Sequence, residues 1–374
     1  MQIAEVKTSR DKRLFLDLPK SIYKNDPNWV RPLDVDIEAV FNEQKNPYFQ
    51  WGKCTRWILL KDNKVIGRIA AFINEKKAYK HKQPTGGCGF FECIDNQDAA
   101  DLLFDTARIW LAERGMQAMD GPVNFGETDL WWGLLVEGFS RPYYGTNYHP
   151  PYYKRLFERF GFTTLYEQIS NRLDITRPFP ERFGKISEWV EKKAGYSFEH
   201  FSIRRFDKFL NDFIEIYNDA WQNHEGHASI SAESVRETFS KIKPVLDEKL
   251  IWFSYINNEP ASFVVLVPDA NELICNLNGK LGWIGKLKFL YNRYRHVNKR
   301  MRALVMGTKQ KYQNHGLESA MFTRIKAYVL PLKRYREMEL SWVGAFNTKM
   351  MSLHEATGAV FTKKHITYRY IFNS

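Results

Sequence analysis

The chain has 374 residues, of which 44% are hydrophobic and 15% aromatic, so it can fill sizeable cores and is not mainly disordered. A formal net charge of +12 suits a polyanionic ligand, a nucleic acid or an acidic membrane, and it also suits a protein that simply has a basic surface. No apolar run is long enough to span a bilayer, and the N-terminus lacks a signal-peptide pattern, which predicts a soluble, cytoplasmic protein. The four cysteines form no CxxC pair and lack histidines at ligand spacing, so we expect neither a disulfide framework nor a metal site.

Strand and helix patterns alternate through the first half of the chain. We expect strands at 2–7, 55–60, 65–73, 88–94 and 119–125, helices at 12–23, 98–114 and 152–160, and an extended segment at 162–175. The helix at 98–114 is the clearest, because six of its residues share one face and Gly115 follows its end: Ala99, Leu102, Leu103, Thr106, Ala107 and Trp110.

The same order of elements recurs in the second half. We expect strands at 197–206, 250–256, 261–267, 302–306 and 339–343, helices at 208–221, from 231, from 317 and at 348–356, and closing strands that reach residue 372. A proline pair at 178 and 180 separates the halves, which predicts two blocks at residues 1–176 and 181–374. Each block is expected to be α+β, with helices flanking a mixed sheet.

The sequence Lys311–Ala320 (KYQNHGLESA) lies between an apolar strand and a helix. The first amides of a helix lack intrahelical partners and carry partial positive charge, so they can hold a phosphate. Gly316 would let the backbone approach such a ligand closely, because it has no Cβ. This turn is therefore a candidate phosphate site, and an ordinary strand–helix turn is the alternative.

A second pattern, Asn347–Ala359, is a helix that ends at Gly358. His354 near its end could protonate a leaving group, because the pKa of histidine lies near neutral pH, although a lone histidine is more often structural. Asn347 has a sufficient structural explanation as the N-cap of the helix. No pattern identifies a general base, and Glu339, on the strand beside the turn, is the candidate.

With these motifs in place, the chain resembles a tandem protein of the GNAT (GCN5-related N-acetyltransferase) superfamily. The family loop Gln/Arg-x-x-Gly-x-Gly/Ala, which binds the pyrophosphate of acyl-CoA, matches residues 313–318 except at Glu318. The resemblance implies that an acyl-CoA co-substrate binds the following residues: Gln313, Asn314, His315, Gly316, Leu317, Lys311 and Asn347. His354 replaces the family tyrosine that lies near the thiolate leaving group.

The first block departs further from the family pattern. Its loop at 92–98 is acidic and lacks glycine, and Phe157 occupies the tyrosine position, so we expect a copy that does not bind coenzyme and instead serves as a scaffold or recognises the acceptor. The stretches 120–133 and 141–153 combine glycine, proline, aromatic and polar residues, as binding loops do and as loops that cap a core also do. The candidate acceptor-pocket residues are Asn124, Glu127, Asn147, Tyr148 and Tyr152.

Residues 273–317 contain no acidic side chain and include a basic, amphipathic stretch around 283–294. A lid over the coenzyme, contact with a peripheral membrane surface or RNA, and a simple packed helix all fit this stretch. The implied function is an acyl-CoA-dependent N-acyltransferase that moves an acetyl or longer acyl group to a small-molecule amine or amino-acid-like acceptor. The alternatives are a transferase that uses aminoacyl-tRNA or a long-chain acyl donor, or an inactive ligand-binding protein, and nucleic acid is the less favoured partner.

Overall fold

The computed structural model describes residues 1–79, 83–128, 130–222 and 229–372. Its strands in the first half are β1 (Gln2–Glu5), β2 (Gly52–Lys61), β3 (Lys64–Asn74), β4 (Thr85–Cys93), β5 (Ala118–Gly121), β6 (Leu134–Glu137) and β7 (Thr163–Asp174). Those in the second half are β8 (Tyr196–His200), β9 (Ile251–Ile256), β10 (Glu259–Pro268), β11 (Arg300–Thr308), β12 (Glu337–Gly344) and β13 (Val360–Ile371).

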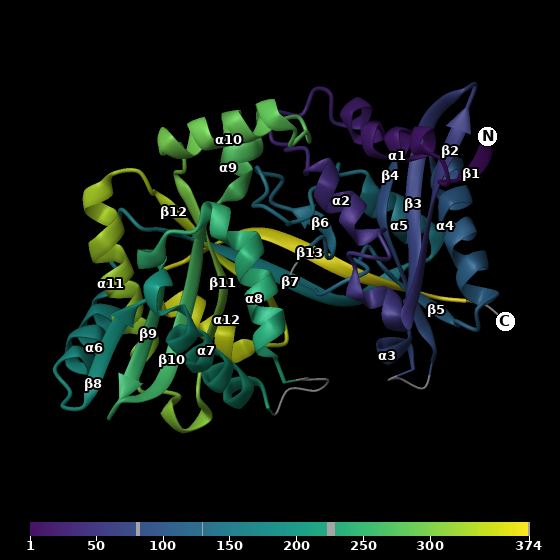
Figure 1. The fold of residues 1–374 in the computed structure, drawn as a ribbon. Coiled ribbons are helices and arrows are strands. Elements are labelled where there is room, and N and C mark those ends of the chain that lie inside the picture. Colours follow the sequence, from purple (N-terminus) through teal and green to yellow (C-terminus); the bar gives the residue numbers. More distant parts are fainter. Residues whose placement is uncertain (80–82, 129, 223–228, 373–374) are drawn as a thin grey trace.

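Helices flank these strands in both halves (Figure 1). They are α1 (Ser9–Ile22), α2 (Asp34–Val40), α3 (Glu75–Ala78), α4 (Gln97–Ala112), α5 (Tyr153–Phe160), α6 (Glu181–Glu191), α7 (Phe206–Trp221), α8 (Ala232–Ile242), α9 (Ala270–Ile274), α10 (Trp283–Tyr294), α11 (Leu317–Leu332) and α12 (Thr348–Ala356). Short 3₁₀ helices cover Pro47–Trp51, Ile203–Arg205, Lys243–Val245, Glu248–Leu250 and Gln310–Tyr312.

One continuous sheet runs through both halves in the order β1-β2-β3-β4-β5-β13-β7-β12-β11-β10-β9-β8, with β6 beside β13. The pairs β4–β5 and β11–β12 are parallel, and the other pairs are antiparallel. A mixed, mostly antiparallel sheet with flanking helices is the α+β architecture that the sequence predicts.

The two central strands are exchanged between the halves. β13, near the end of the chain, pairs with β5 of the first half through Tyr368 and Gly121. β7, at the end of the first half, pairs with β12 of the second, and β7 and β13 also pair with each other. Figure 1 shows them together across the middle of the molecule, β13 in yellow. The division into residues 1–176 and 181–374 falls between β7 and α6 and stays a prediction, because one sheet joins the two parts.

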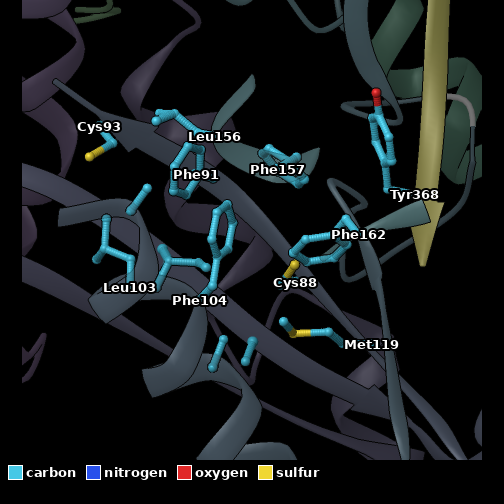
Figure 2. Packing of buried hydrophobic residues seen from close by; sticks show 14 of the residues in the cluster. Cys88, Phe91, Cys93, Leu103, Phe104, Met119, Leu156, Phe157, Phe162 and Tyr368 are labelled. Carbon is cyan, nitrogen blue, oxygen red and sulfur yellow. The ribbon is translucent and has the colours of Figure 1, made fainter. Parts of the chain in front are cut away.

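The core of the first half depends on this exchange (Figure 2). Phe104 of α4 packs against Phe157 of α5, with 4.7 Å between ring centroids. Phe157 in turn lies 5.7 Å from the ring of Tyr368, which β13 supplies. All three side chains are buried. The last strand of the sequence therefore completes the core of the first half, which the repeated order of elements does not reveal.

Two of the predicted strands are too long. The strand predicted at 197–206 ends at His200, and α7 begins at Phe206, because the apolar residues of this segment switch to helical spacing. The strand predicted at 119–125 ends at Gly121, since Pro122 has no N–H to donate to a neighbouring strand.

Candidate active site

A wedge opens in the sheet between the parallel strands β11 and β12. Their register pairs Arg300 with Glu337 and Arg302 with Glu339, and no further pairs follow along the described strands. β11 nevertheless continues to Thr308 and β12 to Gly344, each bonded on its outer side to another strand. Just beyond Arg302 the Ser341 hydroxyl donates to Ala303 O and still bridges the two strands. The edges further along are available to an extended ligand, which could pair with them as an added strand would.

The open end of the wedge leads into the turn before α11. Gly316 is the N-cap residue of α11, and no described side chain caps this helix. The amides of residues 314–318 also make no hydrogen bond to any described group. In the first half, by contrast, Asn96 caps α4 by accepting a hydrogen bond from Ala99 N at 2.8 Å. The N-terminus of α11 can thus still bind an anion, whereas at α4 the Asn96 side chain already occupies one of the helix amides.

Glu318 does not point toward a phosphate at this turn. Its carboxylate accepts a short hydrogen bond from Thr308 at the end of β11. Thr308 also contacts the Ser262 hydroxyl at 2.7 Å, so the three side chains form a small network on the strand side of the turn. The departure from the family pattern at residue 318 therefore serves a local structural purpose.

The cations near the turn are arranged differently from the sequence prediction. Lys311 pairs with Glu259 at 2.8 Å, so its charge is partly neutralised there. Lys349 of α12 instead donates to the Gln313 side chain and places a positive charge on the opposite rim of the wedge. His315 contacts the Tyr196 hydroxyl at 2.7 Å, which turns its ring toward β8.

Gly316 is required for a reason that the sequence does not show. Its φ of +74° is a left-handed conformation, and an added Cβ would lie 2.5 Å from Ile186 of α6. Both observations exclude a side chain at this position. The glycine thus permits close packing of α6 against the turn, in addition to any approach of a ligand.

Two glycine substitutions should have opposite effects on stability. Gly316→Ala is expected to lower the free energy of unfolding by about 1–3 kcal/mol, because it introduces backbone strain and a clash. Gly184→Ala on α6 is expected to raise it by about 0.5–1 kcal/mol, because its Cβ meets nothing within 4 Å and alanine favours a helix. Urea unfolding of both variants measures this, and equal changes would contradict the assigned packing.

At the closed end of the wedge lies a buried charged cluster. Glu339 is 1% exposed, and its Oε1 lies 3.6 Å from Arg302 Nε. Its Oε2 has no hydrogen-bond partner among the described residues. Burial raises the pKa of Glu339, while Arg302 and Lys363 act in the opposite direction. A buried carboxylate with a raised pKa and a free oxygen has the properties of a proton acceptor.

A loop from the first half covers this cluster. Arg302 donates to Tyr144 O at 3.0 Å, and Lys363 of β13 donates to Ser140 Oγ at 3.0 Å. The neighbouring His365 contacts Asn147 O at 3.0 Å. Asn147 is thus the predicted acceptor residue that lies on this covering loop, although its side chain donates to Gly133 O and so holds the loop.

The other predicted acceptor residues lie elsewhere or have structural partners. Tyr148 donates to Asp26 at 2.6 Å, and Tyr152 donates to Cys93 O at 2.8 Å. Glu127 is exposed and accepts a hydrogen bond from Tyr48. Asn124 is buried, and its Oδ1 has no partner among the described residues. The structure does not gather these four side chains with Glu339.

His354 is buried rather than exposed to a ligand. Its Nδ1 lies 3.1 Å from Asn171 Nδ2 on β7, and burial lowers its pKa to about 4. It is therefore neutral near pH 7. Asn347 caps α12 by accepting from Met350 N at 3.1 Å, which is the structural role that its position suggested.

Acidification should destabilise the fold through its buried histidines. The pKa of His354 is lowered from 6.5 to about 4, and those of His149 and His365 are lowered to about 3 and about 4, in each case by burial. Between pH 6.5 and 4 the unfolded chain binds protons that the folded chain excludes, so stability is full above 6.5 and falls as the pH drops.

A thermal melt at each pH measures this effect. His354→Gln should flatten the dependence of the melting temperature on pH. An identical pH dependence in wild type and His354→Gln would contradict the expectation for that residue.

The sequence prediction missed most of the buried cluster. Arg302, Lys363 and His365 were not among the candidate residues, although each interrupts a strand that is otherwise suited to burial. Charged residues at alternate positions in core strands, such as Arg300 with Arg302 and Glu337 with Glu339, are the signal that could have identified them.

Comparisons with known proteins find relatives that align with nearly the whole chain. No family model matches the chain. The bacterial ceramide synthase of Caulobacter vibrioides is 29% identical over 381 residues, which cover 98% of this chain and 97% of that protein. Protein YghO of Escherichia coli is 27% identical over 367 residues, covering 96% and 92%.

Among solved structures, a tandem GNAT protein from the clavulanic acid biosynthesis pathway aligns with 100% of this chain and 99% of its own, at a TM-score of 0.61 and 11% identity. Identity at that level shows the fold alone. Together with the sheet order and the uncapped turn, it confirms the resemblance that the sequence motifs suggested. The chain has the tandem GNAT-type acyltransferase fold.

Proposed function

We propose that the protein is an N-acyltransferase that uses acyl-CoA to form an amide on a long-chain amino alcohol. The observation that carries this proposal is the wedge between β11 and β12, which has an uncapped helix N-terminus at its open end and the buried carboxylate of Glu339 at its closed end. The acceptor class follows the relative named bacterial ceramide synthase, because a ceramide is the amide of a fatty acid and a long-chain amino alcohol.

The turn at residues 314–318 suits the phosphates of acyl-CoA. Its amides make no hydrogen bond to any described group, and Lys349 stands on the opposite rim. Glu318 is occupied by Thr308 and so does not oppose a phosphate directly. Bound there, acyl-CoA supplies the acyl group as a thioester. The turn before α4 in the first half differs, because the Asn96 side chain already accepts a hydrogen bond from the Ala99 amide there.

Glu339 is the proposed general base. The amine must lose a proton when the amide forms, and Glu339 Oε2 is free to accept it. The raised pKa makes this carboxylate a stronger base than an exposed glutamate, while Arg302 and Lys363 favour its ionised form. The catalytic role predicted for His354 from the sequence stays a prediction. We do not include His354 in the proposed mechanism, because its ring is buried against Asn171.

The proposal is tested by incubating the protein with acyl-CoAs of increasing chain length and a long-chain amino alcohol. We expect release of the CoA thiol and an amide of the corresponding mass. Absence of amide with every acyl-CoA, together with no heat on titration of acyl-CoA, would overturn the proposal.

A matched pair of lysine variants tests the coenzyme site. Lys349→Gln should weaken acyl-CoA binding by about tenfold, the equivalent of one charge-assisted hydrogen bond of roughly 1.5 kcal/mol. Lys241→Gln removes the same charge from α8, where the lysine pairs with Glu237, and should leave the Kd unchanged. Equal effects on calorimetric binding would place the coenzyme elsewhere.

A further inference from the structure

Helix α10 presents an apolar face that no described part of the protein covers. Its exposed residues are Trp283 (74%), Ile284 (52%), Leu287 (58%), Leu290 (56%), Tyr291 (61%) and Tyr294 (80%). The spacing i, i+1, i+4, i+7, i+8, i+11 places them in one stripe along the helix. A contiguous exposed apolar stripe of this kind marks an interaction surface rather than ordinary surface variation.

The opposite face attaches α10 to the protein. Gly285 and Asn292 are buried on that side, and Phe289 packs into a cluster with Leu273 and Ile274 of α9. Asn292 Nδ2 donates to Leu273 O at 2.8 Å. The apolar stripe is therefore held outward by contacts on the far side of the same helix.

Cations surround the apolar stripe. Lys286, Lys288 and Arg293 lie within α10 and Lys280 and Arg295 just outside it, all exposed. None of the five forms an ion pair with a described carboxylate, and Arg293 donates to the carbonyl of Pro244. At 100° per residue, Lys288 falls on one flank of the stripe and Lys286 with Arg293 on the other.

Helix α10 does not cover the turn at residues 314–318, the proposed phosphate site, which we call the phosphate turn. It precedes β11, whereas the turn follows β11, and the nine residues of that strand span roughly 30 Å. Figure 1 shows α10 along the upper edge of the molecule, with α9 beneath it. The lid considered from the sequence would need α10 at the other end of β11. The helix instead lies at the end of β11 where Arg302 and Glu339 pair.

We propose that α10 lies in the interface of an anionic lipid bilayer, with its apolar stripe among the acyl chains and its flanking cations at the headgroups. An apolar face bordered by lysine and arginine, with tryptophan and tyrosine at its ends, is the arrangement of an interfacial helix. None of the described helices is long and apolar enough to cross a membrane, so the contact is with one leaflet.

Charge decides against the other partners. A second copy of the chain would bring two sets of unpaired cations together across the stripe, whereas an anionic membrane neutralises them. RNA would use the cations but would leave Ile284, Leu287 and Leu290 exposed to water. This inference stands on α10 alone and does not depend on the proposed acyl transfer.

The test is sedimentation of the full-length protein, without substrates, with vesicles of phosphatidylglycerol and phosphatidylcholine in equal parts. We expect binding that weakens with salt and is at least tenfold weaker on pure phosphatidylcholine. Leu287→Ser/Leu290→Ser should weaken binding at least tenfold, and Lys286→Gln/Lys288→Gln about tenfold.

The matched control is Leu330→Ser/Leu332→Ser, which removes two leucines that are 47% and 41% exposed on α11. This variant should bind vesicles like the wild type. The proposal is overturned if the wild type does not sediment, if the control loses binding as much as the α10 variant, or if the α10 variant binds fully. Dimerisation through α10, or RNA binding, in place of vesicle binding would overturn it equally.

Discussion

Glu339→Gln is expected to lower kcat for amide formation by about 10²–10⁴-fold, because it removes the proposed general base while keeping the shape of the side chain. The binding of acyl-CoA, measured by calorimetry, should change little, since Glu339 lies at the closed end of the wedge and the phosphate turn at the open end. A loss in kcat with retained coenzyme binding would separate a role in proton transfer from one in coenzyme binding.

Glu337→Gln is the matched control for this prediction. Glu337 lies two residues earlier on β12, and its substitution removes the same charge, but it is only partly buried and pairs with Arg172 at 2.7 Å. Turnover of this variant should stay within about threefold of wild type. Because Glu339→Gln deprives Arg302 of its buried carboxylate, a thermal melt of each variant must show a folded protein at the assay temperature. Full activity of folded Glu339→Gln would exclude the glutamate as base.

Tyr368→Ala is expected to lower the free energy of unfolding by about 3–5 kcal/mol, the usual cost of removing a buried aromatic side chain. The ring is 1% exposed and packs on Phe157, and its hydroxyl donates to Glu158 at 3.0 Å. The effect is large because the residue, although six positions from the C-terminus, belongs to the core of the first half. Urea unfolding followed by tryptophan fluorescence measures it.

Two variants refine this measurement. Ile371→Ala, on the same strand but 52% exposed, should change the free energy of unfolding by no more than about 0.5 kcal/mol. Tyr368→Phe should cost about 1 kcal/mol, because it removes the hydrogen bond to Glu158 and keeps the ring. A cost for Tyr368→Ala no greater than that of Ile371→Ala would show that β13 does not complete the core of the first half.

The sequence predicts most elements because local patterns decide them. The helix predicted at 98–114 is α4, and Ala99, Leu103 and Ala107 of its predicted face are buried. The buried face is centred about one residue further round the helix, because it also includes Ala100, Phe104 and Leu111. The hairpins at β2–β3 and β9–β10 follow from paired apolar runs around short polar turns. The sequence also predicts the strand–helix turn before α11, because a glycine between an apolar strand and a helix is a local pattern.

Long-range pairing explains what the sequence did not predict. No local pattern shows that β13 pairs with β5 or that β7 pairs with β12. The alternation of apolar residues in these strands is equally compatible with pairing inside each half and with pairing between the halves. Of the cluster at the closed end of the wedge, Glu339 alone was predicted. Arg302 and Glu339 lie on the paired strands β11 and β12 of the second half, whereas Lys363 lies on β13, on the far side of β7 from β12, and depends on the exchange.

The exchanged strand has a consequence for how the chain matures on the ribosome. Domains of multidomain chains usually fold one after another as the N-terminal one emerges. Here β5 of the first half has no strand on its β13 side until residues 360–371 have been synthesised, so that edge stays unpaired while the second half is translated. An open strand edge invites association with other chains. The nascent protein should therefore need chaperone protection until β13 has been synthesised.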